Sequence, residues 1–595
     1  MTYSAPVDDI LFALETAVDL PSLLERGVYE GLDMETIRAV IGEAGRFGTD
    51  VLDPLNQLGD QVGSHLVNGH VKTPDGWKDA YRQFCEAGWN ALPGPAAYGG
   101  QELPETLAVA VTEIWNAANL SFSLCPLLTQ SAVAALQSHG SDELKALYLP
   151  HLVSGRWPGT MNLTEPHCGS DLAALRTRAA KQEDGTYRLF GTKIFITYGD
   201  HDLAENVVHM VLARTDDAPP GTRGISLFLV PKFLVKTDGT LGARNDVITA
   251  GVEHKLGIHA SPTCTLKYGE TNGAVAFLVG EENRGLNIMF IMMNAARLAV
   301  GMQGVAIAER ATQRAVAYAQ ERKQGRGPTA KSGEMSPIIE HPDVRRSLMT
   351  MKSFVRAARA ICLVTAREID LMHLGETAEI RERAAAISAL LTPVAKSFCT
   401  DVGVEVASMG IQIHGGMGYM EETGAAQYYR DARILPIYEG TNGIQAIDLV
   451  TRKLPLLDGG VVREFIADLQ DTVDEIRSSN RPEFGHMGER LSDAVIALRE
   501  TSEYLMKQLQ SNPEAALAGA DQYLRLFGLA TGGTYLARGA IAAVRDDASS
   551  NGRASGVASA RFFAEHLLVA APAHAKAIIT GSEGLAAITP DLLAN

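Results

Sequence analysis

The spacing of apolar residues changes twice along this chain of 595 residues. Up to about residue 155 the spacing is mostly helical, and one helix is expected to begin after Ser141 as its N-cap and to end near Gly155. From Gly159 to about Gly280 the apolar runs become short and are separated by Gly, Pro, Asp and Asn, as strands are. Helical spacing returns at about Gly285. This order predicts an α+β multidomain protein.

The middle segment contains four strand-like runs, which read TYRLFGTKIFIT, VVHMVLAR, GISLFLVP and AVAFLVG. No helical pattern lies between them. Parallel strands need long crossover connections, so this series predicts an antiparallel barrel or sandwich rather than a parallel sheet. No GxGxxG motif follows a predicted strand, so a Rossmann domain is not expected.

The segment after residue 283 predicts two helical bundles. Long apolar patterns at 288–325, 341–372 and 382–416 indicate the helices of the first bundle. Two amphipathic faces mark the second, and they are formed by Val462, Phe465, Ile466, Leu469, Val473 and Ile476 and by Val495, Leu498, Leu505 and Leu509. We therefore expect an N-terminal extension at 1–36, a helical domain at 37–158, a β domain at 159–282, a helical bundle at 283–455 and a further C-terminal helical domain at 456–595.

The charge and the cysteines exclude several classes of partner. The net charge of −17 leaves no excess of Lys and Arg for phosphate contacts, so no nucleic-acid partner is expected. The six cysteines are scattered, without a CxxC pair or zinc spacing, so neither a metal site nor a disulfide framework is indicated. We read no signal peptide and no apolar run of membrane-spanning length, so no membrane association is expected and the cytoplasm is the predicted location.

One carboxylate stands out because of its neighbours. Glu439 follows an apolar run that includes Leu435 and Ile437, and it precedes the turn sequence Gly-Thr-Asn-Gly. Asn442 and Gln445 have the spacing of a capping box, so a helix is expected to begin there. Glu439 should then lie on a tight turn that aims its side chain into a cleft. The alternative is a surface Glu near a helix N-terminus, which the helix dipole also favours.

Five motifs resemble those of the acyl-CoA dehydrogenase family, in that family's order and spacing. They are MNLTEPHCGSD at 161–171, GTKIFIT at 191–197, QIHGGMGYM at 412–420, YRDARI at 429–434 and IYEGTNGIQ at 437–445. The resemblance covers roughly residues 40 to 450. It implies an acyl-CoA dehydrogenase-like fold, with an α-helical domain, a β-barrel or sandwich domain and an α-helical bundle, here followed by an extra C-terminal helical bundle. The extension, the loop after residue 323 and that extra bundle are most similar to the large bacterial 3-methylmercaptopropionyl-CoA dehydrogenases.

The resemblance implies FAD-dependent α,β-dehydrogenation of an acyl-CoA thioester, with Glu439 as the catalytic base. In the family, the backbone N–H of this Glu and a flavin ribityl hydroxyl polarise the thioester carbonyl. Burial in an apolar pocket should raise the pKa of Glu439 toward neutral pH. 3-Methylmercaptopropionyl-CoA is the substrate expected from the branch, and ordinary short-, medium- or long-chain acyl-CoA thioesters are the alternative.

The family pattern also implies which residues contact the ligands. The expected FAD contacts are Met161, Leu163, Thr164, Gly169, Ser170, Phe195, Thr197, Arg322, Gln412, Gly415, Gly416 and Thr441, with Arg322 and residues 412–416 reaching the flavin of a second subunit. The expected substrate contacts are Ser170, Asn294, Arg297, Tyr438 and Gly440. Plainer structural explanations exist for several of these residues. The TEPHCGSD motif is also typical of a loop with a helix cap. Arg322 is also typical of an exposed helix end, and Thr441 is also typical of the start of a helix.

Three positions depart from the family pattern. Phe195 stands where many members have Trp, Gly325 stands where an aromatic residue is common, and Gly443 replaces a common Gln. They put the shielding of the flavin and the adenosine contacts in question. The expected partners are an electron-transfer flavoprotein and a second copy of the chain in a homodimer. An acyl-CoA oxidase and a non-enzymatic flavin-binding module are the competing functions, and the retained Glu439 argues against the second.

Overall fold

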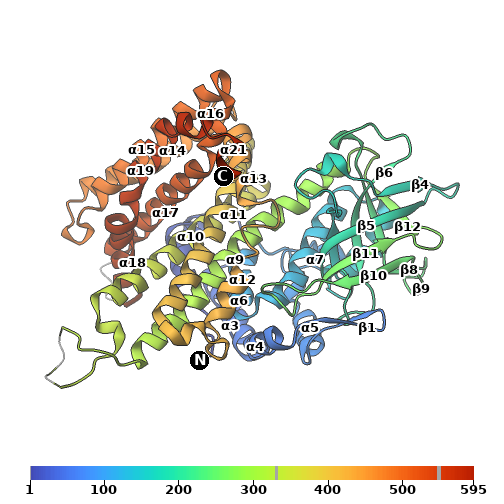
Figure 1. Cartoon of the computed structure of the whole chain (residues 1–595), viewed down its shortest axis with the longest axis horizontal. Coiled ribbons are helices and arrows are strands. Elements are labelled where there is room, and N and C mark those ends of the chain that lie inside the picture. Colours follow the sequence, from blue (N-terminus) through green and yellow to red (C-terminus); the bar gives the residue numbers. More distant parts are fainter. Residues whose placement is uncertain (1, 329–330, 332, 546–550, 595) are drawn as a thin grey trace. The chain divides into compact units, whose positions relative to one another are not determined.

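The computed structural model describes residues 2–328, 331, 333–545 and 551–594. It divides into two compact units. One unit comprises residues 47–104 and 118–296, and the other comprises residues 1–46, 105–117 and 297–595. We call them the β unit and the helical unit and describe each by itself (Figure 1). The long helix α9 (Gly285–Glu321) begins in the β unit and continues in the helical unit.

The helices of the β unit precede its large sheet in sequence. They are α4 (Asp53–Val62), α5 (Trp77–Glu86), α7 (Leu120–His139) and α8 (Asp142–Val153). The predicted N-cap of α8 is confirmed, because the hydroxyl of Ser141 accepts a hydrogen bond from the N–H of Leu144 at 3.3 Å. A short hairpin of β1 (His65–Val67) and β2 (His70–Lys72) lies between α4 and α5.

The large sheet closes into a ring. Strand β5 (Tyr187–Thr197) pairs with β12 (Ala274–Val279), β12 with β7 (Ser226–Pro231), β7 with β6 (Val208–Thr215), β6 with β4 (Arg178–Lys181), and β4 with β5. Three further strands extend it, namely β3 (Gly159–Asn162), β10 (Val247–Val252) and β11 (Thr263–Tyr268). Strands β8 (Phe233–Val235) and β9 (Leu241–Arg244) form a separate hairpin. The predicted barrel is thus present, and Figure 1 shows its strands gathered together.

The barrel is mostly antiparallel, as predicted, but two strand pairs are parallel. Strand β6 pairs in parallel with both β3 and β4, while the other pairings are antiparallel. The sequence reading missed β3 and β4 because each has only four residues and no alternating pattern. The interior is packed with large apolar side chains from several strands, including Leu189, Phe228 and Leu266. Strands β6 and β7 are buried almost throughout, so they also lack the alternation of a strand with one wet face.

The helical unit is built around three long helices, as predicted. They are the second part of α9, α10 (Pro342–Leu374) and α11 (Ala378–His414). The shorter helices around them are α1 (Val7–Thr16), α2 (Leu20–Glu25), α3 (Met34–Phe47), α6 (Glu105–Ala118), α12 (Ala425–Ala432) and α13 (Asn442–Asp448). Helix α1 packs against α10, so the N-terminal extension is part of this unit.

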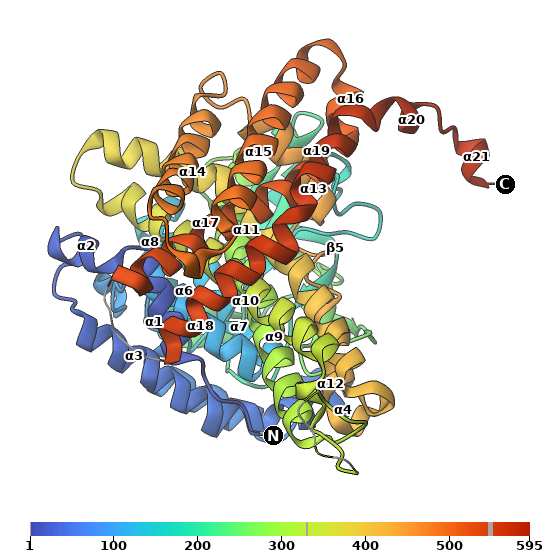
Figure 2. The same cartoon turned by 90° about the vertical axis from the view of Figure 1, so that its left-hand side faces the viewer.

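The regular secondary structure of the described C-terminal residues consists of helices joined by short turns (Figure 2). Its helices are α14 (Gly460–Ser478), α15 (Met487–Ser511), α16 (Pro513–Ala518), α17 (Ala520–Arg545), α18 (Asn551–Phe562), α19 (Ala571–Thr580), α20 (Ser582–Ala586) and α21 (Pro590–Ala594). The predicted apolar faces of α14 and α15 are buried, except that Leu509 is half-buried. Helix α17 packs against α10, α11 and α13, so these helices share one unit with the central bundle.

No apolar run long enough to cross a membrane was expected from the sequence. Judged by length and mean hydropathy alone, this expectation is wrong. Among the described residues, three segments qualify, namely Leu120–His139, Gly285–Glu321 and Ala554–Thr580. In the most apolar window of each, 83%, 67% and 33% of the residues are buried inside the protein. The first two are therefore mostly core helices, whose apolar composition serves packing.

Candidate active site

Glu439 lies on a tight turn between α12 and α13, as the sequence predicted. Its φ of 55° is in the left-handed region, which is unfavourable for a residue with a Cβ, and Gly440 follows with a φ of 82°. The expected capping box is wrong in register by one residue. Thr441 is the N-cap, because its hydroxyl accepts a hydrogen bond from the N–H of Ile444 at 3.3 Å. Asn442 is the first residue of α13 instead.

The backbone of this turn is held from α13. The side-chain amide of Gln445 donates to the carbonyl oxygens of Glu439 at 3.4 Å and of Gly440 at 3.3 Å. A Cβ at Gly440 would come within 2.6 Å of that amide nitrogen, so a side chain at this position would displace the contact. Leu435 is buried as predicted, but Ile437 is 50% exposed and does not belong to the core.

The carboxyl group of Glu439 is poised to change protonation state near neutral pH. Burial raises its pKa to about 7, although the positive charges of Arg297 and Lys396 act in the opposite direction. Neither the carboxylate nor the backbone N–H of Glu439 forms a hydrogen bond with any described residue. A carboxylate with this pKa and no internal partner is suited to remove a proton from a bound molecule.

Two other expected substrate residues surround Glu439 in the helical unit. Arg297, on α9, is buried, and burial lowers its pKa while the charges of Asp448 and Glu439 raise it. The hydroxyl of Tyr438 donates to the side-chain oxygen of Gln303, whose amide donates to Asn116 at 3.3 Å. The helical unit therefore brings Arg297, Tyr438, Glu439 and Gly440 together.

The two expected flavin motifs of the β unit also meet each other. The Nζ of Lys193 on β5 donates to the carbonyl of Leu163 at 2.9 Å, and the N–H of Ile194 donates to the carbonyl of Thr164 at 3.0 Å. The loop after β3 is thus fastened along β5. A Cβ at Gly169 would come within 3.3 Å of the methyl group of Thr164, so this loop is folded tightly on itself.

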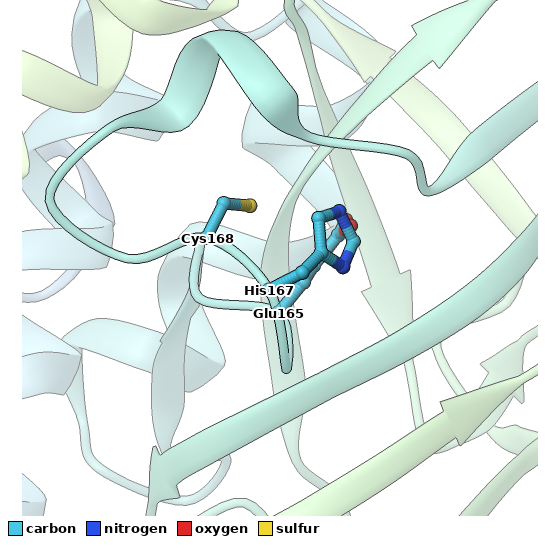
Figure 3. A group of neighbouring side chains, drawn as sticks. All are labelled: Glu165, His167 and Cys168. Carbon is cyan, nitrogen blue, oxygen red and sulfur yellow. The ribbon is translucent and has the colours of Figure 1, made fainter.

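Glu165, His167 and Cys168 gather within this loop (Figure 3). Their potential ligand atoms all lie within 4.8 Å of one another. However, the Glu165 carboxylate already accepts hydrogen bonds from Lys193, from the N–H and hydroxyl of Thr177 and from the N–H of Arg176. The imidazole of His167 contacts the carbonyl of Ala174 at 3.0 Å. These hydrogen bonds stabilise the loop and account for the positions of Glu165 and His167 without a metal ion.

The surface beside the loop carries one exposed aromatic side chain. Phe195 is 59% exposed and has a φ of 60°, so strained backbone holds a large apolar ring out toward solvent. Thr164 and Thr197 are half-buried, and Gly169 and Ser170 are exposed. Met161 is buried in β3, and its contact with the flavin stays a prediction. An exposed ring between hydroxyl groups is the kind of surface that a flavin would cover.

Most of the remaining expected residues lie at the ends of α9 and α11. Arg322 is exposed just after α9, and Gln412, Gly415 and Gly416 are exposed at the end of α11. These two ends are neighbours, because the rings of Tyr318 and His414 stack with centroids 4.4 Å apart. Asn294 is exposed on the part of α9 that belongs to the β unit.

From the sequence, no site role was predicted for four buried polar residues, which are Glu165, Lys193, Lys396 and Gln445. Lys396 had a usable signal, because it is a single cation within the apolar helical pattern LLTPVAKSF. A buried ammonium group is costly and therefore rarely present without a role. Lys193 had a weaker signal, since one lysine in a strand is commonly exposed.

Comparison with known proteins identifies the family of the whole chain. Four family models match, described as acyl-CoA dehydrogenase N-terminal domain (65–156), middle domain (160–270) and C-terminal domain (283–454), and acetyl-CoA dehydrogenase C-terminal like (465–589). The chain is 46% identical to a 3-methylmercaptopropionyl-CoA dehydrogenase of Ruegeria pomeroyi, over 99% of this chain and 100% of that one. It is 32% identical to the broad-specificity linear acyl-CoA dehydrogenase FadE5 of Mycobacterium tuberculosis, over 95% of each chain.

A solved structure shows the same fold over most of the chain. ACDH-11 of Caenorhabditis elegans, crystallised with C11-CoA, superposes with a TM-score of 0.75 at 22% identity and covers 92% of this chain and 90% of its own. The full-length relatives and the matching family models together establish that this chain belongs to the acyl-CoA dehydrogenase family of FAD-dependent oxidoreductases.

Proposed function

We propose that Glu439 is the base with which this acyl-CoA dehydrogenase removes the α-proton of its thioester substrate. The observation that carries the proposal is the carboxyl group itself, which has a pKa raised to about 7 by burial and no hydrogen-bond partner among the described residues. An ionised carboxylate held in this way is ready to accept a proton at neutral pH.

A carbon-bound α-proton is removed only if the thioester carbonyl is polarised at the same time. The backbone N–H of Glu439 donates to no described residue, which leaves it available to that carbonyl oxygen, and the hydrogen bonds from Gln445 hold the turn that presents it. Bound FAD would supply the chemistry of accepting the β-hydride. Arg297 and Tyr438 line the same turn and would contact the substrate.

The flavin would be held by the β unit and by a second copy of the chain. Phe195, Thr164 and Thr197 present the exposed ring and the hydroxyl groups for it, and Leu163, Gly169 and Ser170 belong to the adjoining loop. The exposed residues at the ends of α9 and α11, Arg322 and 412–416, would complete the flavin site of the second copy. We therefore propose a homodimer, and an active, flavin-loaded monomer in analytical sedimentation would contradict it.

The substrate proposed is 3-methylmercaptopropionyl-CoA, which would become methylthioacryloyl-CoA. It is supported by the 46% identity to the Ruegeria pomeroyi enzyme of that name across the whole chain. The alternative, a range of linear acyl-CoA thioesters, is supported by the more distant FadE5. Values of kcat/KM for 3-methylmercaptopropionyl-, butyryl-, octanoyl- and palmitoyl-CoA would separate the two, and a preference for octanoyl- or palmitoyl-CoA would reject the first.

The electrons would pass to an electron-transfer flavoprotein in the cytoplasm. Flavin reoxidation by that protein should be much faster than by air, whereas rapid reoxidation by oxygen with release of peroxide would identify an oxidase instead. We further propose that the domains of the family pattern span 1–36, 37–158, 159–282, 283–455 and 456–595.

Replacing Glu439 by Gln tests the central proposal. The variant should bind FAD and acyl-CoA, but the rate of flavin bleaching per bound FAD should fall by about 10²–10⁴-fold, as for removal of a positioned base. A variant that bleaches its flavin within several-fold of the wild-type rate would show that the base lies elsewhere. A variant with low flavin content but normal activity per flavin would show that Glu439 has only a structural role.

A further inference from the structure

Lys396 is a cation buried in the middle of α11. The residue is 0% exposed, and its Nζ forms no ion pair with a carboxylate among the described residues. The Nζ donates instead to the neutral side-chain oxygen of Asn442, at 2.8 Å. A buried ammonium paired only with an amide is less stable than an apolar side chain of similar size would be. Packing therefore does not account for a lysine at this position.

Asn442 joins Lys396 to the turn that carries Glu439. It is three residues after Glu439, its own N–H donates to the carbonyl of Pro436 at 2.9 Å, and it begins α13. Its amide group donates to Asp401 at 2.7 Å and to Thr400 at 3.0 Å, both on α11. The buried side chain of Asn442 thus uses both its oxygen and its nitrogen to fasten the start of α13 to α11.

The charges around Glu439 come from two helices. Arg297 on α9 and Lys396 on α11 both favour its ionised form. Lys396 in turn is influenced by Glu439, Asp401 and Arg297, and burial lowers its pKa to about 7. Asp401 is buried enough to raise its pKa, and Arg525 on α17 is among the charges that oppose this. The charge of each group, Glu439 and Lys396, therefore acts on the pKa of the other.

We propose that Lys396 and Asn442 are positioning residues for Glu439: Asn442 fixes the catalytic turn to α11, and the buried ammonium of Lys396 supplies positive charge that keeps the Glu439 carboxylate ionised. This inference rests on the proposed role of Glu439 as the base. It assigns two separable tasks, one geometric and one electrostatic, to a pair of residues outside the proposed substrate and flavin contacts.

Two substitutions separate the tasks. Lys396→Gln removes the charge and keeps a donor for Asn442, while Asn442→Ala removes the link and keeps the charge. A third variant, Lys396→Met, removes both donor and charge. Lys352→Met is the matched control, because Lys352 is a half-buried lysine of the same unit whose pKa is also lowered by burial, but it faces Asp9, Glu309 and the arginines of α10 rather than Glu439.

The measurement is the rate of flavin bleaching per bound FAD, without air, from pH 6 to 9, with 3-methylmercaptopropionyl-CoA and with butyryl-CoA. In Lys396→Gln and Lys396→Met the pKa that governs this rate should move upward by about one unit, which lowers the rate about tenfold below the pKa and restores it by pH 9. Asn442→Ala should lower the rate at every pH. Lys352→Met should follow the wild-type profile.

A readout without turnover tests the same coupling. Melting temperatures at pH 7 of wild type, Lys396→Gln, Glu439→Gln and the double variant form a double-mutant cycle, and the two substitutions should not be additive. Additive melting temperatures, together with a pH profile in the Lys396 variants that superimposes on wild type, would overturn the proposal. If the Lys396 variants lose their flavin, the double-mutant cycle is measured on the apoproteins, and its additivity decides between the two outcomes. A normal rate of flavin bleaching in Glu439→Gln would reject the role of Glu439 as the base. That result is distinct from a failure of the role proposed for Lys396 and Asn442.

Discussion

The Nζ of Lys193 lies 2.9 Å from Oε1 of Glu165, and the two side chains are 0% and 3% exposed. Burial alone would raise the pKa of Glu165, but the Lys193 ammonium and the hydrogen bonds of Thr177 and Arg176 outweigh it and lower that pKa. Burial lowers the pKa of Lys193 to about 8, against the opposing charge of Glu165. This ion pair joins the loop at 163–170 to β5, so it connects the two flavin motifs.

Breaking this buried pair should destabilise the β unit. Lys193→Met leaves the Glu165 carboxylate buried without its counter-charge, and the expected loss is about 3–5 kcal/mol of the free energy of unfolding. Lys181→Met is the control, because Lys181 is 66% exposed in its pair with Glu282 and should cost at most about 1 kcal/mol. Denaturant unfolding of the apoproteins and the FAD content after purification measure the effect. Equal losses in the two variants would contradict it.

The catalytic rate should rise with pH through neutrality. Because burial raises the pKa of Glu439 to about 7, the carboxyl group is protonated and unable to act as a base below that pH. Flavin bleaching should therefore be slow at pH 6, increase through pH 7 and level off above pH 8. A rate that stays constant from pH 5.5 to 8.5 would contradict this pKa for the base.

The ionised carboxylate of Glu439 should also destabilise the folded protein at high pH. Its pKa is higher in the folded protein than the ordinary value of 4.5, so the folded state retains the proton between those values and is stabilised by it at low pH. That stability is lost as the pH rises through about 7. Glu439→Gln should consequently melt above wild type at pH 8 and close to wild type at pH 4.5. Identical melting temperatures at both pH values would contradict the burial of this charge.

A second buried cation holds the helical unit together. The guanidinium of Arg359 on α10 lies 2.6 Å from Glu113 on α6 and 2.9 Å from Glu309 on α9. Arg359→Met should lower the free energy of unfolding by about 3–5 kcal/mol, because two carboxylates lose their counter-charge. Adding Glu113→Gln should recover part of the loss. The exposed pair of Arg383 with Glu464 provides the control, since Arg383→Met should cost at most about 1 kcal/mol.

Close packing of α9 on α11 depends on one glycine. A Cβ at Gly304 would lie 2.2 Å from the carbonyl oxygen of Cys399, so Gly304→Ala should push the helices apart and cost about 1–3 kcal/mol. A Cβ at Gly42 in α3 would meet no atom within 4 Å, and Gly42→Ala should stabilise the protein by about 0.5–1 kcal/mol. Thermal unfolding of both variants measures the difference. A neutral Gly304→Ala would contradict the helix contact.

Much of this protein could be predicted from local patterns in the sequence. The change from helical to strand spacing and back placed the β domain and the long helices α9, α10 and α11. The turn before α13 was predicted from the apolar run, Glu439 and the Gly-Thr-Asn-Gly segment, and the family motifs pointed to the same residue. These features are local, because helix and strand periods and turn residues depend on neighbours within a few positions.

Only the tertiary structure decided which residues surround those features. Lys396 meets Asn442 across 46 positions of sequence, Lys193 meets Glu165 across 28, and the four-residue strand β4 finds parallel pairing with β6. Such partners are determined by the packing of segments that are far apart in sequence. The residues next to a buried side chain in the sequence therefore do not reveal which remote residue it contacts. The carboxylate of Glu439 could therefore be found from the sequence, whereas the charges that set its pKa could be found only from the fold.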